Sequence, residues 1–214
     1  MVIPMEFSRV NFFRWRYEAR FEYKLMLAII FAIFTGMCAQ IRIPLPWTPV
    51  PITMQTFAVF LSAIILGKNW GGISQFIYVS LGTLGIPWFA GFKGGISAIL
   101  GPTGGYLLGF IIAAFFIGYF IDRFILSRFF ITLLPLLLFA NFIIIHGLGC
   151  TWLYFWLLSI GKYPSLSEIL LMGSLPFVPG DLAKIFALAA IGKLIMPKSA
   201  YNGEIDVGRK YKLF

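Results

Sequence analysis

Asp181 and Lys184 are the ionisable pair of the motif FVPGDLAK (residues 177–184), which lies inside a long apolar segment. At a helical spacing of i and i+3, the two side chains share one face. Ionisable groups inside a membrane-length segment are costly and usually mark a functional site. A carboxylate accepts hydrogen bonds from N–H groups, and an ammonium donates to a carbonyl or carboxylate. We therefore expect the pair to bind a polar ligand; a structural ion pair that fixes helix packing is the alternative.

A proline-rich segment, IPLPWTPVPITMQT (residues 43–56), offers further polar groups. Its four prolines favour a stiff, extended path. Thr53 and Gln55 follow them, with Thr48 and Thr56 as further hydrogen-bonding side chains. We expect a rigid lid over a polar site; an ordinary helix entry, with Pro and Thr as capping residues, is the alternative.

A second connection, from Gly85 through Tyr106, is rich in glycine, which lets the backbone approach a ligand closely. We expect a binding loop here, with a plain irregular connection as the alternative. Lys93 and Tyr106 belong to this segment, as do Trp88 and Phe89. Most aromatic residues on this side are expected to anchor at the membrane interface, and one or two to line the pocket.

Other polar residues of the apolar segments are assigned to packing. Asn141 and His146 are expected to form helix–helix hydrogen bonds. Gln75 and Tyr78 are interpreted as packing residues near the cytoplasmic end of their span. Cys38 and Cys150 are expected to be small buried apolar residues.

The composition requires these residues to be positioned by a membrane domain. The chain is 60% hydrophobic and 12% charged, whereas soluble domains hold about 25% charged residues. A span needs about 20 mostly apolar residues. Six candidates meet or approach this length: residues 23–40, 52–66, 71–86, 105–121, 129–160 and 165–196. The second and third are short. The sixth is interrupted by two prolines, so its helix is expected to restart near Phe177.

The basic residues predict the orientation. Thirteen of the 17 Lys and Arg residues fall into four groups at alternate ends of the spans, which is the positive-inside pattern. We predict an all-α integral membrane protein with six transmembrane helices in one compact bundle and both termini cytoplasmic. The predicted divisions are a basic cytoplasmic N-terminal segment (residues 1–22), the six-helix domain (23–196) and a cytoplasmic C-terminal tail (197–214) that contains Arg209, Lys210 and Lys212.

Several function classes are disfavoured. The net charge of +9 is explained by topology, so no nucleic-acid partner is expected. With one histidine, no nucleophile–base pair and no carboxylate cluster, neither an enzyme nor a metal site is predicted. The motif GxxxxGK[ST] does not occur, so the chain does not hydrolyse ATP by that route.

Taken together, these motifs resemble the BioY family, the biotin-specific S components of energy-coupling-factor (ECF) vitamin transporters. The resemblance rests on IPLPWTPVPITMQT, GGISQFIYVSLGTLGIPWFAG, GGISAILGPTGGYLLGF and FVPGDLAK in this order, and it extends over about residues 23–196. It implies a multi-pass protein of a prokaryotic cell membrane that captures biotin from outside without a cofactor. An S component for another vitamin, or a structural subunit without a ligand, is the alternative.

The resemblance also assigns roles. It implies a transmembrane coupling protein and two cytoplasmic ATPases as partners in the lipid bilayer, with Ala28 and Ala32 on the surface that meets the coupling protein. The ligand-binding pair of the family corresponds to Asp181 and Lys184. Positions near Lys93 and just after Tyr106 also contribute in relatives. Because the second of these is Leu107 here, it is open which group meets the biotin carboxylate; Lys93 is our hypothesis.

Overall fold

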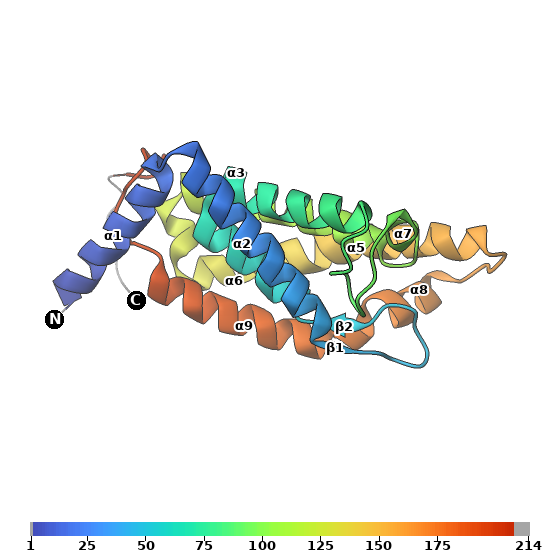
Figure 1. Ribbon diagram of the computed structural model, residues 1–214. Coiled ribbons are helices and arrows are strands. Elements are labelled where there is room, and N and C mark those ends of the chain that lie inside the picture. The colour runs from blue at the N-terminus through green and yellow to red at the C-terminus, as the bar shows by residue number, and fades with distance from the viewer. Residues whose placement is uncertain (1, 208–214) are drawn as a thin grey trace.

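The computed structural model describes residues 2–207, with side chains from residue 6 onward. The chain forms an elongated helical bundle with a two-stranded ribbon toward one end and the N-terminal helix at the other (Figure 1). In chain order the described elements are α1 (Val2–Glu18), α2 (Phe21–Gln40), β1 (Arg42–Ile43), β2 (Ile52–Thr53), α3 (Gln55–Thr83), α4 (Ile96–Ile99), α5 (Gly104–Arg123), α6 (Phe130–Phe139), α7 (His146–Ser159), α8 (Leu166–Gly173) and α9 (Val178–Ile195).

Five helical stretches of the described chain are long and apolar enough to cross a membrane. They are Phe21–Gln40, Gln55–Thr83, Gly104–Arg123, Phe130–Ser159 and Leu166–Ile195. The structure therefore confirms a mostly helical chain with several helices of membrane-spanning character. It differs from the all-α prediction in one feature, since β1 and β2 pair antiparallel, Arg42 with Thr53 and Ile43 with Ile52.

α3 is one of these five stretches, and it reverses direction at Gly67. This residue has φ 76° and ψ −167°, a backbone region that is essentially restricted to glycine. The two halves then run side by side, because Gln75 Nε2 donates to Ser62 Oγ at 3.0 Å and Gln55 Nε2 donates to Tyr78 Oη at 2.8 Å. These halves correspond to the two short apolar segments predicted at residues 52–66 and 71–86.

The two long apolar segments are interrupted helices. The first consists of α6 and α7, joined by a π-helical stretch (Ala140–Ile145). The second begins with α8, passes through a 3₁₀ turn (Leu175–Phe177) and continues as α9 from Val178. The predicted restart of the helix near Phe177 is confirmed, and Pro176 and Pro179 cause it because neither can donate a helical hydrogen bond.

The described parts of the two segments outside the predicted membrane domain pack against it. Much of the basic N-terminal segment forms α1, and residues 197–207 fold back onto the same end of the bundle. Arg128 Nη2 lies 2.6 Å from Glu204 Oε1, and both side chains are fully buried. The rest of the predicted tail, including Arg209, Lys210 and Lys212, lies outside the described residues.

Candidate ligand-binding site

Asp181 is the centre of a buried polar network in the first turn of α9. The positive end of the helix dipole favours a carboxylate at this position. Its Oδ1 lies 2.6 Å from Lys184 Nζ, and its Oδ2 lies 2.9 Å from both His146 Nε2 and Asn141 Nδ2. Because a carboxylate offers about four acceptor positions, Asp181 can still accept a further hydrogen bond, and its side chain lines a cavity.

Lys184 connects α9 to the start of α3. Besides Asp181, its ammonium donates to Thr53 O at 3.0 Å and to Thr56 Oγ1 at 2.7 Å. An ammonium has three hydrogens, and all three have acceptors here. Lys184 therefore donates to a ligand only by giving up one of these partners, and its role in this arrangement is to neutralise and position Asp181.

His146 holds the other side of the carboxylate. Its Nδ1 lies 2.8 Å from Ser174 Oγ, so a neutral imidazole can accept there and donate from Nε2 to Asp181. His146 and Asn141 thus form the expected helix–helix hydrogen bonds, but His146 also lines the cavity. The sequence signal for this role was the presence of two polar residues in an otherwise apolar span.

The cavity has a volume of about 70 Å³ and apolar walls around its polar end. Six of the eight residues predicted to bind ligand line it: Thr53, Gln55, Phe89, Tyr106, Asp181 and Lys184. The apolar lining comes mainly from Val50, Ile52, Leu107, Phe110, Ile145 and Phe177.

Tyr106 and Gln55 are fixed by hydrogen bonds to other elements. Tyr106 Oη donates to Gly173 O at 2.6 Å, which ties α5 to the end of α8. Gln55 Oε1 accepts from Thr53 Oγ1 at 3.0 Å, and its amide reaches Tyr78. Tyr78 is a buried packing residue, as interpreted from the sequence. It packs against Trp88 and Phe89 beside Gln55 at the cavity end of the bundle, and not near the opposite end of its span.

The other two predicted residues lie outside this cavity. Trp88 donates from Nε1 to Tyr78 O at 2.9 Å and packs against that ring. Lys93 borders a larger outer cleft of about 570 Å³, which Arg42 also lines. Four residues line both spaces and separate them: Pro51, Phe89, Ala90 and Thr103.

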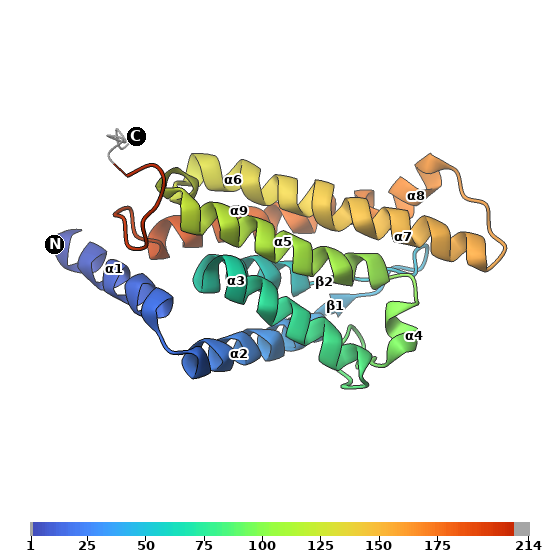
Figure 2. The same ribbon diagram turned by 90° about the horizontal axis from the view of Figure 1, so that it is seen from above.

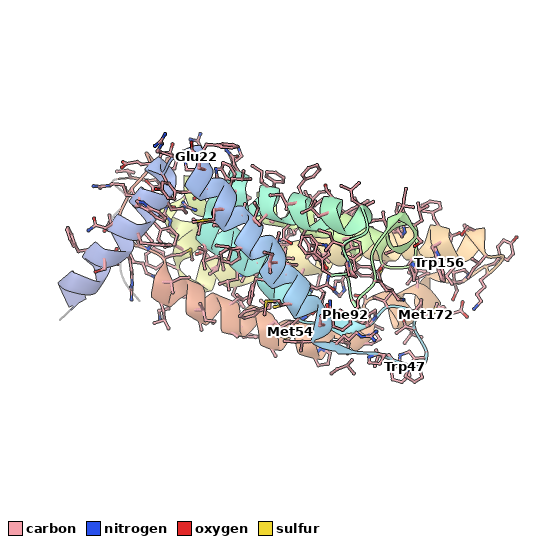
Figure 3. All side chains as sticks on the ribbon, in the orientation of Figure 1. Glu22, Trp47, Met54, Phe92, Trp156 and Met172 are labelled. Carbon is pink, nitrogen blue, oxygen red and sulfur yellow. The ribbon has the colours of Figure 1, made fainter. Side chains whose placement is uncertain are left out.

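The proline-rich loop and the glycine-rich loop meet at this end of the bundle. Gln40, at the end of α2, donates from Nε2 to Trp88 O and Phe89 O and accepts from Phe92 N. Thr48 Oγ1 donates to Met172 O at 2.7 Å. Figure 3 shows Trp47, Met54, Phe92 and Met172 gathered at this end, far from Glu22 at the other.

Ala28 and Ala32, predicted to meet a partner, are fully buried. They share a face of α2 with Thr35, whose hydroxyl accepts from Gln75 of α3 at 3.2 Å. Neither alanine is presented on the surface of this structure. Among the residues that the structure describes, no group of three or more His, Cys, Asp or Glu side chains is arranged to hold a metal ion.

Comparisons with known proteins agree with this architecture. The model of the BioY family matches residues 15–200. A probable biotin transporter BioY of Methanothermobacter thermautotrophicus is 49% identical over 69% of this chain and 94% of its own length. The biotin transporter BioY of Thermotoga maritima is 42% identical over 78% of this chain and 92% of its own.

A solved structure has the same fold. The crystal structure of an S-component for biotin from an ECF-type ABC transporter superposes with a TM-score of 0.71 at 27% identity, covering 80% of this chain and 89% of that one. With its apolar helices, this chain is an integral membrane protein of a transporter family and not an enzyme. The extent of the family match shows that the chain belongs to the BioY family.

Proposed function

We propose that this chain is the substrate-binding component of an energy-coupling-factor transporter and that its substrate is biotin. The observation that carries the proposal is the buried carboxylate of Asp181 at the polar end of an apolar cavity. Biotin has a ureido ring with N–H donors, and Asp181 has acceptor capacity left for one of them. The apolar walls suit the rest of the bicyclic ring, as in most small-molecule sites.

The remainder of the ligand is expected to reach the outer cleft. The inner cavity of about 70 Å³ is smaller than the roughly 300–1,000 Å³ of typical ligand sites. Displacement of Pro51 and Phe89 would join it to the cleft of about 570 Å³. Lys93 and Arg42 line that cleft, and among its described lining residues there is no acidic side chain. This charge supports our hypothesis that the biotin carboxylate pairs with Lys93.

Six crossings with both termini cytoplasmic are part of this proposal. Each half of α3 then crosses once, with the reversal at Gly67 on the inner side. Asn11 in α1 and Tyr163 after α7 are both exposed and would lie on opposite sides of the membrane. In intact cells, a membrane-impermeant thiol reagent should label a cysteine at position 163 and not one at position 11; the reverse pattern would invert the topology.

A transmembrane coupling protein and two cytoplasmic ATPases are the proposed partners, in a prokaryotic plasma membrane. Contact through Ala28 and Ala32 requires α2 to move away from α3, because both alanines are buried. Without such a movement a partner that docks on α2 meets its exposed stripe, which includes Ile29, Ile33 and Met37. Affinity purification of the chain from its native membrane, followed by identification of the co-purified subunits, tests these partners.

Mass spectrometry of the ligand that co-purifies with the solubilised protein tests the substrate. Calorimetry with a panel of vitamins then ranks biotin against other candidates. Biotin as both the co-purified ligand and the tightest binder supports the proposal. Preference for another vitamin would leave an S component of different specificity, and binding of no vitamin would favour a structural subunit.

A further inference from the structure

Helices α1 and α2 meet at the opposite end of the bundle from the ribbon β1–β2 (Figures 1 and 2). A groove lies at this meeting point. We call it the α1–α2 groove. It has a volume of about 440 Å³ and is lined by Asn11, Arg14, Trp15, Glu18, Ala19, Arg20 and Tyr23. The family model begins at residue 15, so most of α1 lies outside the part of the chain that the family match covers.

The inner face of α1 is fixed to the bundle, which gives the groove a defined wall. Arg16 Nη2 lies 2.7 Å from Asp122 Oδ1 and 2.9 Å from Tyr201 Oη. Phe13, 2% exposed, packs on the ring of Tyr201. Glu6 Oε1 accepts from the backbone N–H groups of Lys198 and Ser199. The outer face of α1 is therefore held in a set orientation.

The α1–α2 groove combines exposed aromatic and basic side chains from α1, from the connection after it and from the start of α2. Trp15 and Tyr23 are 47% and 51% exposed, and Arg14 and Arg20 are also exposed. Within the described part of the chain, Arg14 has no hydrogen-bond or ion-pair partner. Arg20 has Glu22 at 3.7 Å, with both side chains mostly exposed, a pair of little energetic value. Two guanidinium groups are thus available on a surface that no other part of the described chain covers.

The position of the groove identifies its occupant. Phe21–Gln40 is a candidate membrane span, so residues 14–23 lie where hydrocarbon gives way to water. Aromatic residues and arginines at this depth are typical of contact with lipid headgroups. Guanidinium groups bind phosphate oxygens in pairs of charge-assisted hydrogen bonds. Glu18 reduces the positive charge of the groove, which weakens its attraction for a free anion. A lipid also gains apolar contact with Trp15 and Tyr23, which a free anion does not.

We propose that the α1–α2 groove binds the phosphate of an anionic phospholipid through Arg14 and Arg20. The proposal is independent of the ligand at Asp181. Such a contact would anchor α1 at the membrane surface and stabilise the entry into α2. Anionic lipids attract basic juxtamembrane segments in general, so the experiment must separate the groove from the overall positive charge.

The test is a titration of the detergent-solubilised chain with phosphatidylglycerol or phosphatidylcholine, followed by native mass spectrometry. The double variant Arg14→Gln/Arg20→Gln should bind phosphatidylglycerol about tenfold less tightly, and its preference over phosphatidylcholine should disappear. The matched control, Lys162→Gln/Lys193→Gln, removes the same charge away from the groove and should bind as the wild type does. Unchanged thermal stability without lipid and unchanged biotin binding would show that the double variant is folded.

Three results would overturn the proposal. If the double variant and its control lose the same affinity for phosphatidylglycerol, the overall positive charge of the chain explains the binding and the groove does not. Displacement of the lipid by millimolar glycerol phosphate would identify a site for a free anion instead. Retention of phosphatidylglycerol by the folded double variant would show that the groove is not the binding site, and that α1 presents its aromatic face to something else, such as a protein partner.

Discussion

Asp181 combines two tasks that are difficult to separate in a buried site. It neutralises Lys184, whose side chain is 9% exposed, and it provides the acceptor that we propose for the ureido ring. Removing one partner of a buried ion pair leaves the other charge uncompensated, which typically costs several kcal/mol. A single substitution at Asp181 therefore affects folding as well as binding, and the two effects need different readouts.

The first prediction separates them. Asp181→Asn should weaken biotin binding by roughly ten- to a hundredfold, which corresponds to about 1.5–3 kcal/mol for a hydrogen bond to a charged group. It should also lower the melting temperature, because the buried side chain of Lys184 loses its ion-pair partner. In the double variant Asp181→Asn/Lys184→Met, stability should recover while binding does not. Calorimetry and thermal unfolding in detergent measure the two quantities, and wild-type affinity in a folded Asp181→Asn protein would exclude the proposed role.

The second prediction concerns Lys93, whose exposed side chain lines the outer cleft. Lys93→Ala should weaken binding of free biotin by roughly fivefold at most, or up to about 1 kcal/mol for an exposed ion pair. Binding of biotin methyl ester, which lacks the negative charge, should change little. If both ligands lose the same affinity, Lys93 does not pair with the carboxylate and Arg42 becomes the next residue to test.

At the scale of elements, the turn at Gly67 sets the register of the two halves of α3. A Cβ at Gly67 would lie 2.2 Å from Asp122 Oδ2, which accepts from Lys68 N at 2.8 Å. The turn is thus stabilised by the same carboxylate that binds Arg16 of α1. The backbone conformation and the lack of space both require glycine here.

Gly67→Ala should accordingly destabilise the protein by more than the about 1–3 kcal/mol that the backbone conformation alone costs. Gly147→Ala is the matched control, because Gly147 is helical and a Cβ there meets no atom within 4 Å. That change should be neutral or stabilising by up to about 1 kcal/mol. Thermal unfolding in detergent compares the two variants; equal melting temperatures would mean that the turn is not specific to glycine.

Much of the arrangement of elements follows from the sequence because it depends on local chemistry. Apolar length marks the spanning helices, and Pro176 with Pro179 marks the start of α9. The network around Asp181 depends on contacts between distant segments, and the sequence indicates only its members. The spacing of Asp181 and Lys184 predicts a shared face, but nothing local shows that His146 completes the site or that Trp88 packs away from it. The burial of Ala28 and Ala32 is likewise decided by the packing of α2 on α3.

At the scale of the molecule, the two ends of the bundle carry different polar networks. One surrounds the ligand cavity, and the other joins α1, the end of α5 and the segment 197–207. In this second network Tyr201 Oη donates to Asp122 at 3.1 Å and accepts from Arg16. Burial raises the pKa of Tyr201, so its hydroxyl keeps the proton that it donates. The guanidinium of Arg128 lies 4.4 Å from the centre of the same ring.

The separation of the two ends leads to a final prediction about Glu204, which pairs with Arg128 where both side chains are fully buried. Glu204→Gln should leave the Arg128 charge uncompensated and free the segment 197–207, at a cost of about 3 kcal/mol. Hydrogen exchange of that segment should rise, while biotin affinity should stay unchanged because the cavity lies at the other end. Glu22→Gln, which removes an exposed partner of Arg20, should cost under about 1 kcal/mol. Loss of biotin affinity in a folded Glu204→Gln protein would show instead that the two ends are coupled. Release of the segment 197–207 would then have changed the structure of the cavity around Asp181.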